Sequence, residues 1–361
     1  MSEYLTSEIE FDFEEHKQKT ILEYLQLQPQ YEAFSSSLKS ILEHCLEQSG
    51  VYYHSIEARA KSIQSVGEKS ARPSKSDPNR PRYTEPLKEI TDLAGVRIIT
   101  FFTSTLQQVD EIIKREFVVL ERSDKSELLD EKLGYLSIHY LVTLNHNRNN
   151  LLEYSRFNQL IAEIQVRTIL QHAWAEIEHD IQYKSEVAIT KSIRRRFTDL
   201  AGLLEIADRE FQSIQEEDEK SRNESRANVR EGRLAEVEIT PDALKEYLNK
   251  KFGIDGRMTD FSYKYFASHL IEMGFSDFKQ IDDCINGLDS ISISRTIWGQ
   301  RQGQLSRFED ALLTGMGENF KRLHPYAQRE NREEWYSFWD SRFKKLEEAG
   351  IEIGNYDPNA S

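Results

Sequence analysis

Apolar residues recur at helical spacing through the first part of the chain, from Ile21 to Ser49. Leu38, Ile41 and Cys45 fall three and four positions apart, which predicts an amphipathic helix. The next stretch, VYYHSIEARAKSIQSVGEKSAR (residues 51–72), also predicts a helix. Four prolines in RPSKSDPNRPRYTEP (residues 72–86) then end regular structure.

Three later segments carry strand patterns. EITDLAGVRIITFF (residues 89–102) predicts a central strand buried on both faces, from the nearly continuous apolar run of Val96, Ile98, Ile99, Phe101 and Phe102. YLSIHYLVTL (residues 135–144) and LIAEIQVRT (residues 160–168) alternate apolar and polar residues, as strands with one buried face do. Helical patterns lie around them, in residues 106–117, 169–184 and 193–214.

The order of these elements divides the chain into four parts. Residues 1–40 are predicted to be an N-terminal helical segment, and alternating strands and helices predict an α/β core of mixed α+β character over residues 41–214. Residues 215–236 lack an apolar face and are expected to be a charged linker or an exposed helix. Residues 237–361 are predicted to be mainly helical, with Thr240 as an N-cap before Pro241.

Composition and charge narrow the class of protein. The 361 residues suggest two or three domains, and the net charge of −15 disfavours general coating of nucleic acid while leaving room for a local basic cleft. The two cysteines, Cys45 and Cys284, provide neither a disulfide framework nor a Cys-rich zinc site. The acidic N-terminus has no apolar core of a signal peptide, and no apolar stretch approaches membrane-spanning length. We therefore expect a soluble, cytoplasmic protein that does not enter membranes.

Polar side chains occupy one face of two predicted strands. Glu163, Gln165 and Arg167 share a face, because successive strand residues point to opposite sides. This face either lines a polar site or simply meets solvent. Tyr135 and His139 likewise share a face, where the aromatic ring can stack on a nucleobase or form a cross-strand pair.

Basic residues line one side of the helix predicted over residues 51–72. Lys61, Ser65 and Lys69 lie at successive four-residue steps, with Arg59 near their edge. Like charges at this spacing destabilise a helix unless an anion neutralises them, and a polyphosphate is a suitable anion. The alternative is an ordinary solvated helix face.

Two carboxylates and two arginines lie at the edges of predicted strands. Asp92 and Glu163 suit Mg²⁺, which binds one or two carboxylates together with water and phosphate oxygens. Glu163 can also accept a proton from a hydroxyl group, and Arg97 and Arg167 can bind phosphate oxygens. Asp92 and Arg97 are an odd number of residues apart, so either Ala94–Gly95 forms a bulge or Asp92 precedes the strand.

The segment HAWAEIEHD offers a second metal hypothesis. His172, Glu176 and His179 stand on adjacent helical steps. Trp174 and Ile177 cover the apolar face of the same helix, which favours capping, orienting or solvent-facing roles for the polar groups. The chain contains neither a Walker loop nor a GxGxxG motif, which disfavours P-loop kinases and dinucleotide enzymes.

Four motifs together resemble a known family. RAKSIQSVGEK, ITDLAGVRII, KLGYLSIHY and EIQVRTILQHAWAEIEHDIQYK resemble the synthetase domain of RelA/SpoT-homologue alarmone synthetases, over roughly residues 41–214. The resemblance implies a nucleotidyltransferase-like mixed β-sheet flanked by helices. It also implies transfer of the β,γ-pyrophosphate of ATP to a ribose 3′-hydroxyl, with Mg²⁺ as cofactor.

The resemblance assigns roles residue by residue. It places Asp92 and Glu163 at the metal and in catalysis. It gives ATP binding to Arg59, Lys61, Ser65, Lys69 and Arg97, and acceptor binding to Lys132, Tyr135, His139, Gln165 and Arg167. Many members of the family carry K-x-x-G-Y before the acceptor site, but here Glu131 holds the lysine position.

Several functions fit this resemblance. The first is a small synthetase that makes (p)ppGpp-type or adenine alarmones from ATP and GDP, GTP or adenine nucleotides. The second is a toxic synthetase that pyrophosphorylates the 3′ end of tRNA, with a neutralising or phage-sensing C-terminal domain that binds a protein partner. KSIRRRF (residues 191–197) could meet a tRNA backbone, although a solvated helix end is the preferred interpretation. A catalytically inactive binding module is disfavoured by the intact Asp92 and Glu163, and a homo-oligomer is compatible with either enzyme.

Overall fold

The structure is a computed structural model, and it describes residues 11–124, 137–184, 190–256 and 258–360. The chain forms two compact units, Met1–Ile214 and Gln215–Ser361, called unit 1 and unit 2 below. Each unit has its own hydrophobic core. Within the described ranges, no helix combines the length and apolar character needed to cross a bilayer.

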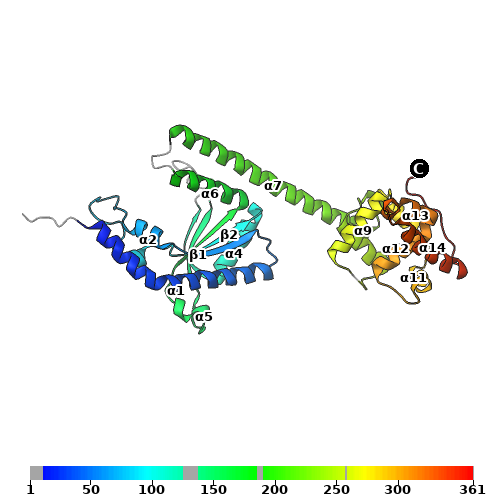
Figure 1. Cartoon of the computed structure of the whole chain (residues 1–361), viewed down its shortest axis with the longest axis horizontal. Coiled ribbons are helices and arrows are strands. Elements are labelled where there is room, and N and C mark those ends of the chain that lie inside the picture. Colours follow the sequence, from blue (N-terminus) through cyan, green and yellow to red (C-terminus); the bar gives the residue numbers. More distant parts are fainter. Residues whose placement is uncertain (1–10, 125–136, 185–189, 257, 361) are drawn as a thin grey trace, which may run out of the picture. The chain divides into compact units, whose positions relative to one another are not determined.

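A five-stranded mixed sheet forms the centre of unit 1 (Figure 1). Its order is β1-β2-β5-β4-β3, where β2 and β5 pair in parallel and the other neighbours are antiparallel. The strands are β1 (Ser55–Ala60), β2 (Ala94–Thr100), β3 (Phe117–Asp124), β4 (Ile138–Leu144) and β5 (Ala162–Thr168). The predicted mixed α/β class is confirmed.

Helices cover the sheet and connect its strands. They are α1 (Phe13–Gln48), α2 (Ile63–Ser70), α3 (Pro86–Glu89), α4 (Thr103–Glu116), α5 (His146–Asn149), α6 (Ile169–Lys184) and α7 (Lys191–Glu231), with a 3₁₀ turn at Ser155–Phe157. Asp12 caps α1 by accepting hydrogen bonds from the backbone N–H groups of Glu14 and Glu15. Helix α1 continues without a break past residue 40, and α7 extends from unit 1 into unit 2.

One face of the sheet packs into the main core and the other carries polar residues. Val96 and Ile98 of β2 and Ile164 of β5 are buried in a cluster with α1 and α4. The intervening residues of the same strands, including Arg97 and Glu163, point to the other side because side chains alternate along a strand. This alternation places the polar residues on a rigid support.

Residues 51–72 differ from the single helix that their pattern predicts. Residues 55–60 form β1, whose register pairs Glu57 with Arg97 and Arg59 with Gly95 of β2. Ile56 is buried while Glu57 is exposed, so this segment follows the period of a strand. Helix α2 begins only after Ser62, whose hydroxyl caps it.

The strand predictions hold with two differences. Strand β2 ends at Thr100, so Phe101 and Phe102 lie after the strand and are only partly buried. In the first half of β2, Gly95 and Arg97 face the polar side, so that part of the strand is not buried on both faces. Strand β3 was not predicted. It begins directly where α4 ends, and Val118 and Leu120 on it are exposed, so its apolar residues merge with the helical pattern before it.

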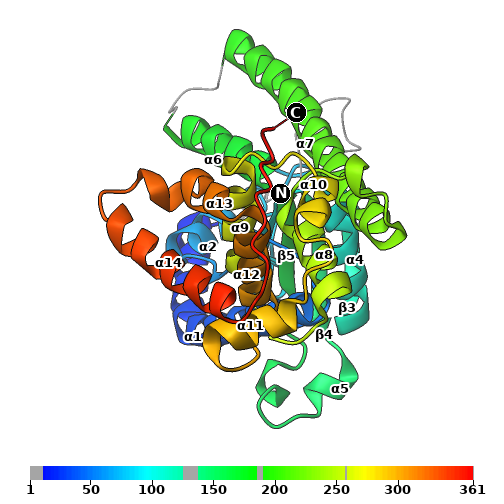
Figure 2. The ribbon, with the colours of Figure 1, turned by 90° about the vertical axis from the view of Figure 1, so that its right-hand side faces the viewer.

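Unit 2 is helical, as predicted for residues 237–361 (Figure 2). It contains α8 (Pro241–Phe252), α9 (Asp260–Glu272), α10 (Phe278–Cys284), α11 (Ser290–Trp298), α12 (Gln304–Met316), α13 (Glu318–Leu323) and α14 (Arg332–Glu348), with 3₁₀ turns at Leu234–Glu236 and Pro325–Gln328. Thr240 caps α8 ahead of Pro241, as its sequence indicates. The buried helix α12 contacts α8, α10, α11 and α13.

Most aromatic residues of unit 2 support its core. Tyr263, Phe278 and Trp339 are buried, whereas Phe261 is 75% exposed and Phe338 is 40% exposed. The aromatic side chains of unit 2 therefore divide between its core and its surface. Cys284 is a free, buried thiol.

Candidate active site

A cavity of about 250 Å³ opens on the polar side of β1, β2 and β5. Ten residues line it: Glu57, Ala58, Arg59, Lys61, Asp92, Gly95, Val96, Arg97, Glu163 and Gln165. The strand register explains this convergence, because Gly95 of β2 lies between Arg59 of β1 and Glu163 of β5. Larger hollows lie beside the start of α1 and in unit 2, but their linings contain none of the predicted site residues.

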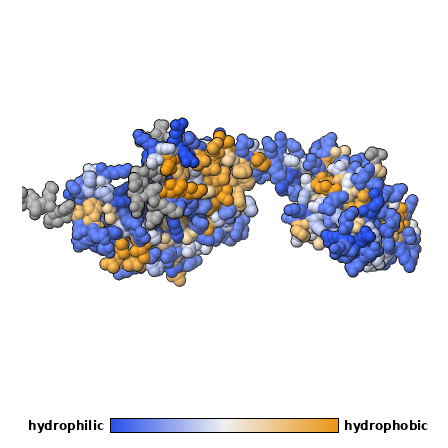
Figure 3. All heavy atoms as spheres, turned by 45° about the horizontal axis from the view of Figure 1, so that its top comes forward, coloured by the Kyte–Doolittle hydropathy of each residue, from blue (hydrophilic) through white to orange (hydrophobic). Residues whose placement is uncertain are grey.

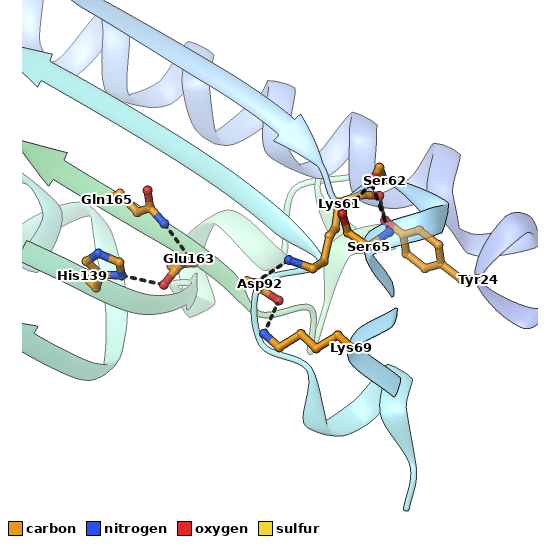
Figure 4. A network of polar contacts seen from close by, with 9 residues as sticks. All are labelled: Tyr24, Lys61, Ser62, Ser65, Lys69, Asp92, His139, Glu163 and Gln165. Carbon is orange, nitrogen blue, oxygen red and sulfur yellow. Dashed lines mark hydrogen bonds and ion pairs between the residues drawn. The ribbon is translucent and has the colours of Figure 1, made fainter. Parts of the chain in front are cut away.

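Asp92 lies before β2, in the turn that leads into the strand, so no bulge is needed to separate it from Arg97. Its two carboxylate oxygens accept hydrogen bonds from Lys61 Nζ at 2.8 Å and from Lys69 Nζ at 3.0 Å (Figure 4). Burial alone would raise the pKa of Asp92, but the hydrogen bonds and charges of the two lysines outweigh it and lower the pKa. Asp92 is therefore an ionised carboxylate clamped by two cations.

The two lysines reach Asp92 from different elements. Lys61 follows β1, and its backbone is held by an N–H···O bond to Leu93 and by the Tyr24 hydroxyl, which donates to its carbonyl. Lys69 stands in the last turn of α2. The prediction of one helical stripe is thus wrong for Arg59 and Lys61, since only Ser65 and Lys69 share a helix. The anion that pairs with both lysines here is the Asp92 carboxylate.

Glu163 belongs to a ladder of polar side chains that crosses β4 and β5. His139 Nδ1 lies 2.7 Å from Glu163 Oε1, and Gln165 Nε2 donates to Glu163 Oε2 at 2.9 Å. The ladder continues at both ends, where Arg167 donates to Gln165 and Ser137 lies 2.6 Å from His139 Nε2. Burial alone would raise the pKa of Glu163, but hydrogen bonding and charge from His139 and the bond from Gln165 lower it.

The arginines occupy different environments. Arg97 pairs with Glu176 at 2.9 Å and with Glu57 at 3.4 Å. Arg167 is buried, and burial followed by the nearby charge of Arg97 lowers its pKa to about 10. The guanidinium is still protonated at neutral pH, and its Nε has no partner within the described structure.

The second metal hypothesis finds no support in the geometry. Glu176 pairs with Arg97, and its Oε1 is 3.8 Å from His172 Nδ1. Burial lowers the pKa of His172, assisted by the charges of Arg97 and Arg167. Over the ranges that the structure describes, no group of three or more His, Cys, Asp or Glu residues is arranged to hold a metal ion.

The structure thus brings together Asp92, Glu163 and most of the predicted ATP side. Arg59, Lys61 and Arg97 line the same cavity, and Lys69 reaches it through Asp92; Gln165, predicted to bind the acceptor, also lines it. Ser65 lies on α2, where its hydroxyl accepts from Ser62 at 2.8 Å. Lys132 and Tyr135, predicted to bind the acceptor, fall outside the described residues.

Sequence reasoning missed Glu57 and Tyr24. Glu57 lines the cavity and pairs with Arg97 across the β1–β2 ladder. The alternation of Ile56 with Glu57 and of Ala58 with Arg59 was a signal for this strand, although alanines also suit a helix. Tyr24 gave no signal, because its hydroxyl acts across 37 positions of sequence.

The region that holds this cavity is similar to known proteins. The family model described as "Region found in RelA / SpoT proteins" matches residues 58–188. GTP pyrophosphokinase YwaC of Bacillus subtilis is 32% identical over 136 residues, which are 37% of this chain and 62% of that protein. GTP pyrophosphokinase YjbM of the same organism is 29% identical over 164 residues, which are 45% of this chain and 72% of that protein.

The chain thus spans about three-fifths of the length of YwaC. Among solved structures, small alarmone synthetase 1 from Bacillus subtilis is 25% identical with a TM-score of 0.46, covering 55% of this chain and 98% of that one. The matched region contains both carboxylates and the lysines that clamp Asp92. Over residues 58–188, this chain is similar to RelA/SpoT proteins.

Proposed function

We propose that unit 1 transfers the β,γ-pyrophosphate of ATP to the 3′-hydroxyl of a guanosine nucleotide, making a (p)ppGpp-type alarmone. One observation carries this proposal: two ionised carboxylates, Asp92 and Glu163, face a single cavity that is rimmed by basic side chains. Transfer of a charged group depends mainly on positioning and on charge stabilisation. A rigid parallel strand pair with both charges at its edge suits that requirement.

The residues present fit Mg²⁺. Asp92 and Glu163 are the oxygen ligands that this ion prefers, and both are ionised in the fold. The negative charge of Asp92 acts to raise the pKa of Glu163, so the two carboxylates interact electrostatically. When bound, Mg²⁺ would neutralise phosphate charge.

The other groups have roles that follow from their positions. Lys61 and Lys69 already hold an anion, so they are suited to phosphate oxygens that enter the cavity. Glu163 can accept the proton of the attacking hydroxyl, and His139 and Gln165 hold its two oxygens in place. These are the chemical requirements for attack by a ribose hydroxyl on a phosphoryl centre.

The decisive experiment offers labelled ATP and Mg²⁺ to the purified full chain with GDP, GTP, AMP, ADP, ATP or bulk tRNA. We expect labelled pyrophosphate on GDP or GTP, and none with the Asp92→Asn variant. Glu153→Gln is the matched control, because it removes an exposed carboxylate of the same unit away from the cavity. If no acceptor receives labelled pyrophosphate, the proposal is rejected. If only adenine nucleotides receive it, the acceptor is an adenine nucleotide and not a guanosine nucleotide.

A second candidate is pyrophosphorylation of the 3′ end of tRNA. Its support is the run Arg194, Arg195 and Arg196 at the start of α7, where all three side chains are exposed. Exposed arginines can contact a phosphate backbone. Label on tRNA that falls when the three arginines are replaced by alanine, while label on GDP does not, would favour this candidate.

We further propose that unit 2 regulates unit 1 in cis or through a protein partner. Unit 2 has a complete core of its own, so it is not needed to complete the fold of unit 1. Its exposed aromatic side chains, such as Phe261, are of the type that dominates protein interfaces.

A further inference from the structure

The first half of α7 buries a carboxylate and leaves apolar residues exposed. Between residues 205 and 214, Asp208 is 3% exposed, whereas Ile206, Phe211 and Ile214 are 50%, 51% and 59% exposed. Figure 3 shows apolar residues gathered on the side of unit 1 to which α6 and α7 belong. Folding normally buries apolar side chains and leaves carboxylates in water, so the reverse arrangement indicates a specific task for Asp208.

The side of α7 that packs on unit 1 changes character along its length. Phe197 and Leu204 pack with Trp174 of α6, and the Phe197 ring meets the Trp174 ring edge-to-face at a centroid distance of 6.1 Å. Asp208 and Gln212 follow at four-residue steps, which keeps them on the same side of the helix. The contact of α7 with unit 1 thus begins with apolar packing and continues with two polar side chains.

Asp208 acts at the junction between β5 and α6. The Thr168 hydroxyl donates to Asp208 Oδ2 at 2.7 Å and accepts from the backbone N–H of Gln171 at 3.2 Å. Gln171 returns this contact, because its side-chain oxygen accepts from the backbone N–H of Thr168 at 2.8 Å. Such a reciprocal pair is a capping box, which fixes the start of α6 on the end of the strand. By accepting the hydrogen bond of the hydroxyl, Asp208 turns the lone pairs of Thr168 toward Gln171.

Gln212 acts at the corresponding junction of the neighbouring strand. Helix α4 follows β2, and its N-cap residue, Phe102, has no polar side-chain atom with which to cap the helix. The side-chain oxygen of Gln212 accepts from the backbone N–H of Ser104 at 3.0 Å, and so satisfies one of the free N–H groups at the start of α4. Thr100 and Thr168 are paired neighbours at the ends of β2 and β5. Helix α7 therefore attaches to both parallel strands at their carboxyl ends.

These two junctions end the strands that carry the site. Strand β2 carries Arg97, and β5 carries Glu163, Gln165 and Arg167. Arg167 immediately precedes Thr168 and donates to Gln165, which in turn donates to Glu163 at 2.9 Å. Side chains held by such a series of contacts need a fixed backbone at its end. A movement of the backbone at Thr168 would therefore reach Glu163 through these contacts.

We propose that Asp208 and Gln212 are positioning residues for pyrophosphate transfer, which hold the ends of β2 and β5 so that the polar ladder on β5 keeps its geometry. This inference rests on the proposed function, and neither side chain is among the ten described residues that line the cavity. Asp92 and its lysines lie at the opposite end of β2, so loss of the attachment should disturb use of the acceptor and not the binding of ATP. Helix α7 continues to Glu231 and buries Val229 in the core of unit 2, so the same helix connects unit 2 to these junctions.

Transfer kinetics on the purified full chain test the role of Asp208. Asp208→Ala should lower kcat/KM for GDP about 10-fold, whereas the dissociation constant for ATP should stay within about twofold. Asp208→Asn, whose amide oxygen can still accept from Thr168, should restore most of the loss. Asp199→Ala is the matched control, because it removes an exposed carboxylate of the same helix. A loss of folding would weaken ATP binding as well, and unchanged GDP kinetics in Asp208→Ala would overturn the proposal.

A double-variant cycle tests whether Asp208 acts through Thr168. Thr168→Val removes the hydroxyl and keeps the shape of the side chain, so adding Asp208→Ala to it should cause little further loss of kcat/KM. Thr168→Ser keeps the hydroxyl and should keep most of the activity. If the losses of the two single variants multiply in the double variant, Asp208 does not act through Thr168 and the proposed route is wrong.

Amide exchange tests the attachment apart from activity. Asp208→Ala should speed exchange of the Gln171 N–H, and Gln212→Ala should speed exchange of the Ser104 N–H, with α12 of unit 2 as internal reference. Unchanged exchange at both positions would overturn the attachment. If the unsubstituted chain transfers pyrophosphate to no acceptor, the proposed function fails and the positioning role fails with it. If the unsubstituted chain is active and Asp208→Ala matches it, only the positioning role fails.

Discussion

Replacing Asp92 by asparagine should affect stability and catalysis through separate causes. The substitution keeps the size of the side chain but removes the charge that holds Lys61 and Lys69. All three side chains are about one-fifth exposed, so the pairs are partly shielded from solvent. Without the carboxylate, two ammonium groups remain close together with no anion between them. Adding Lys69→Met to Asp92→Asn should then relieve part of the damage.

The size of each effect can be worked out from these contacts. A hydrogen bond to a charged group contributes about 1.5–3 kcal/mol, but each lysine can rotate toward solvent once it is released. We therefore expect Asp92→Asn to lower the free energy of unfolding of unit 1 by about 1–2 kcal/mol. Lys69→Met in that background should recover about 1 kcal/mol by removing like-charge repulsion. Pyrophosphate transfer should fall by at least about 100-fold in both variants.

Native-state amide exchange is the suitable assay, because whole-chain unfolding mixes the two units. Exchange in peptides from β2 reports on unit 1, and exchange in α12 of unit 2 serves as an internal reference. The order of protection in β2 should be wild type, then the double variant, then Asp92→Asn. A double variant that exchanges as fast as Asp92→Asn, or faster, would show that repulsion between Lys61 and Lys69 does not destabilise Asp92→Asn.

Three further predictions concern the same unit and its neighbour. Glu163→Gln should abolish transfer while ATP still binds, measured by equilibrium dialysis with labelled ATP, because the basic residues proposed to bind ATP are unchanged; loss of ATP binding would contradict the proposed roles. Folding lowers the pKa of Asp92 and of Glu163 below their ordinary values of 3.8 and 4.5. The ionised carboxylates therefore stabilise the folded unit 1 fully at a pH above those ordinary values, and this stabilisation is lost as the pH falls through the lower pKa values of the folded state. Protection of β2 in amide exchange should therefore fall below about pH 4, and less steeply in Asp92→Asn; equal slopes would count against the clamp. Expression of residues 1–220 should change cell growth relative to the full chain, and Asp92→Asn should cancel that change; an active, soluble truncation with the same growth effect would exclude regulation in cis.

The sequence was sufficient where one local period decided the outcome. Residues 162–168 alternate without interruption, so the common face of Glu163, Gln165 and Arg167 was predictable, and the structure shows it. Residues 55–60 were assigned to a helix because alanines at 58 and 60 fit either period. Residues 55–60 form a strand and not a helix because they pair with β2. Such pairing depends on residues distant in sequence and cannot be predicted from residues 55–60 alone.

The spacing of residues could not predict that Lys61 and Lys69 pair with Asp92. Its partners stand 31 and 23 positions away in sequence, on a strand end and a helix end that meet only after β1 joins β2. The pairing of His139 with Glu163 likewise depends on the register of β4 on β5. Residue types could be identified from the sequence, whereas their partners required the three-dimensional path of the chain.

The charge balance at the cavity explains why its proposed ligands belong together. Lys61 and Lys69 both pair with Asp92, and Arg97 pairs with Glu57 and Glu176. A polyphosphate that took the lysines by itself would leave Asp92 as an unpaired, partly buried anion, which is costly. If the polyphosphate enters with a divalent cation, Asp92 can pair with the cation in place of the lysines. The lysines can then pair with phosphate oxygens in place of Asp92. The same clamp that stabilises unit 1 therefore favours a joint metal–nucleotide ligand over a bare nucleotide.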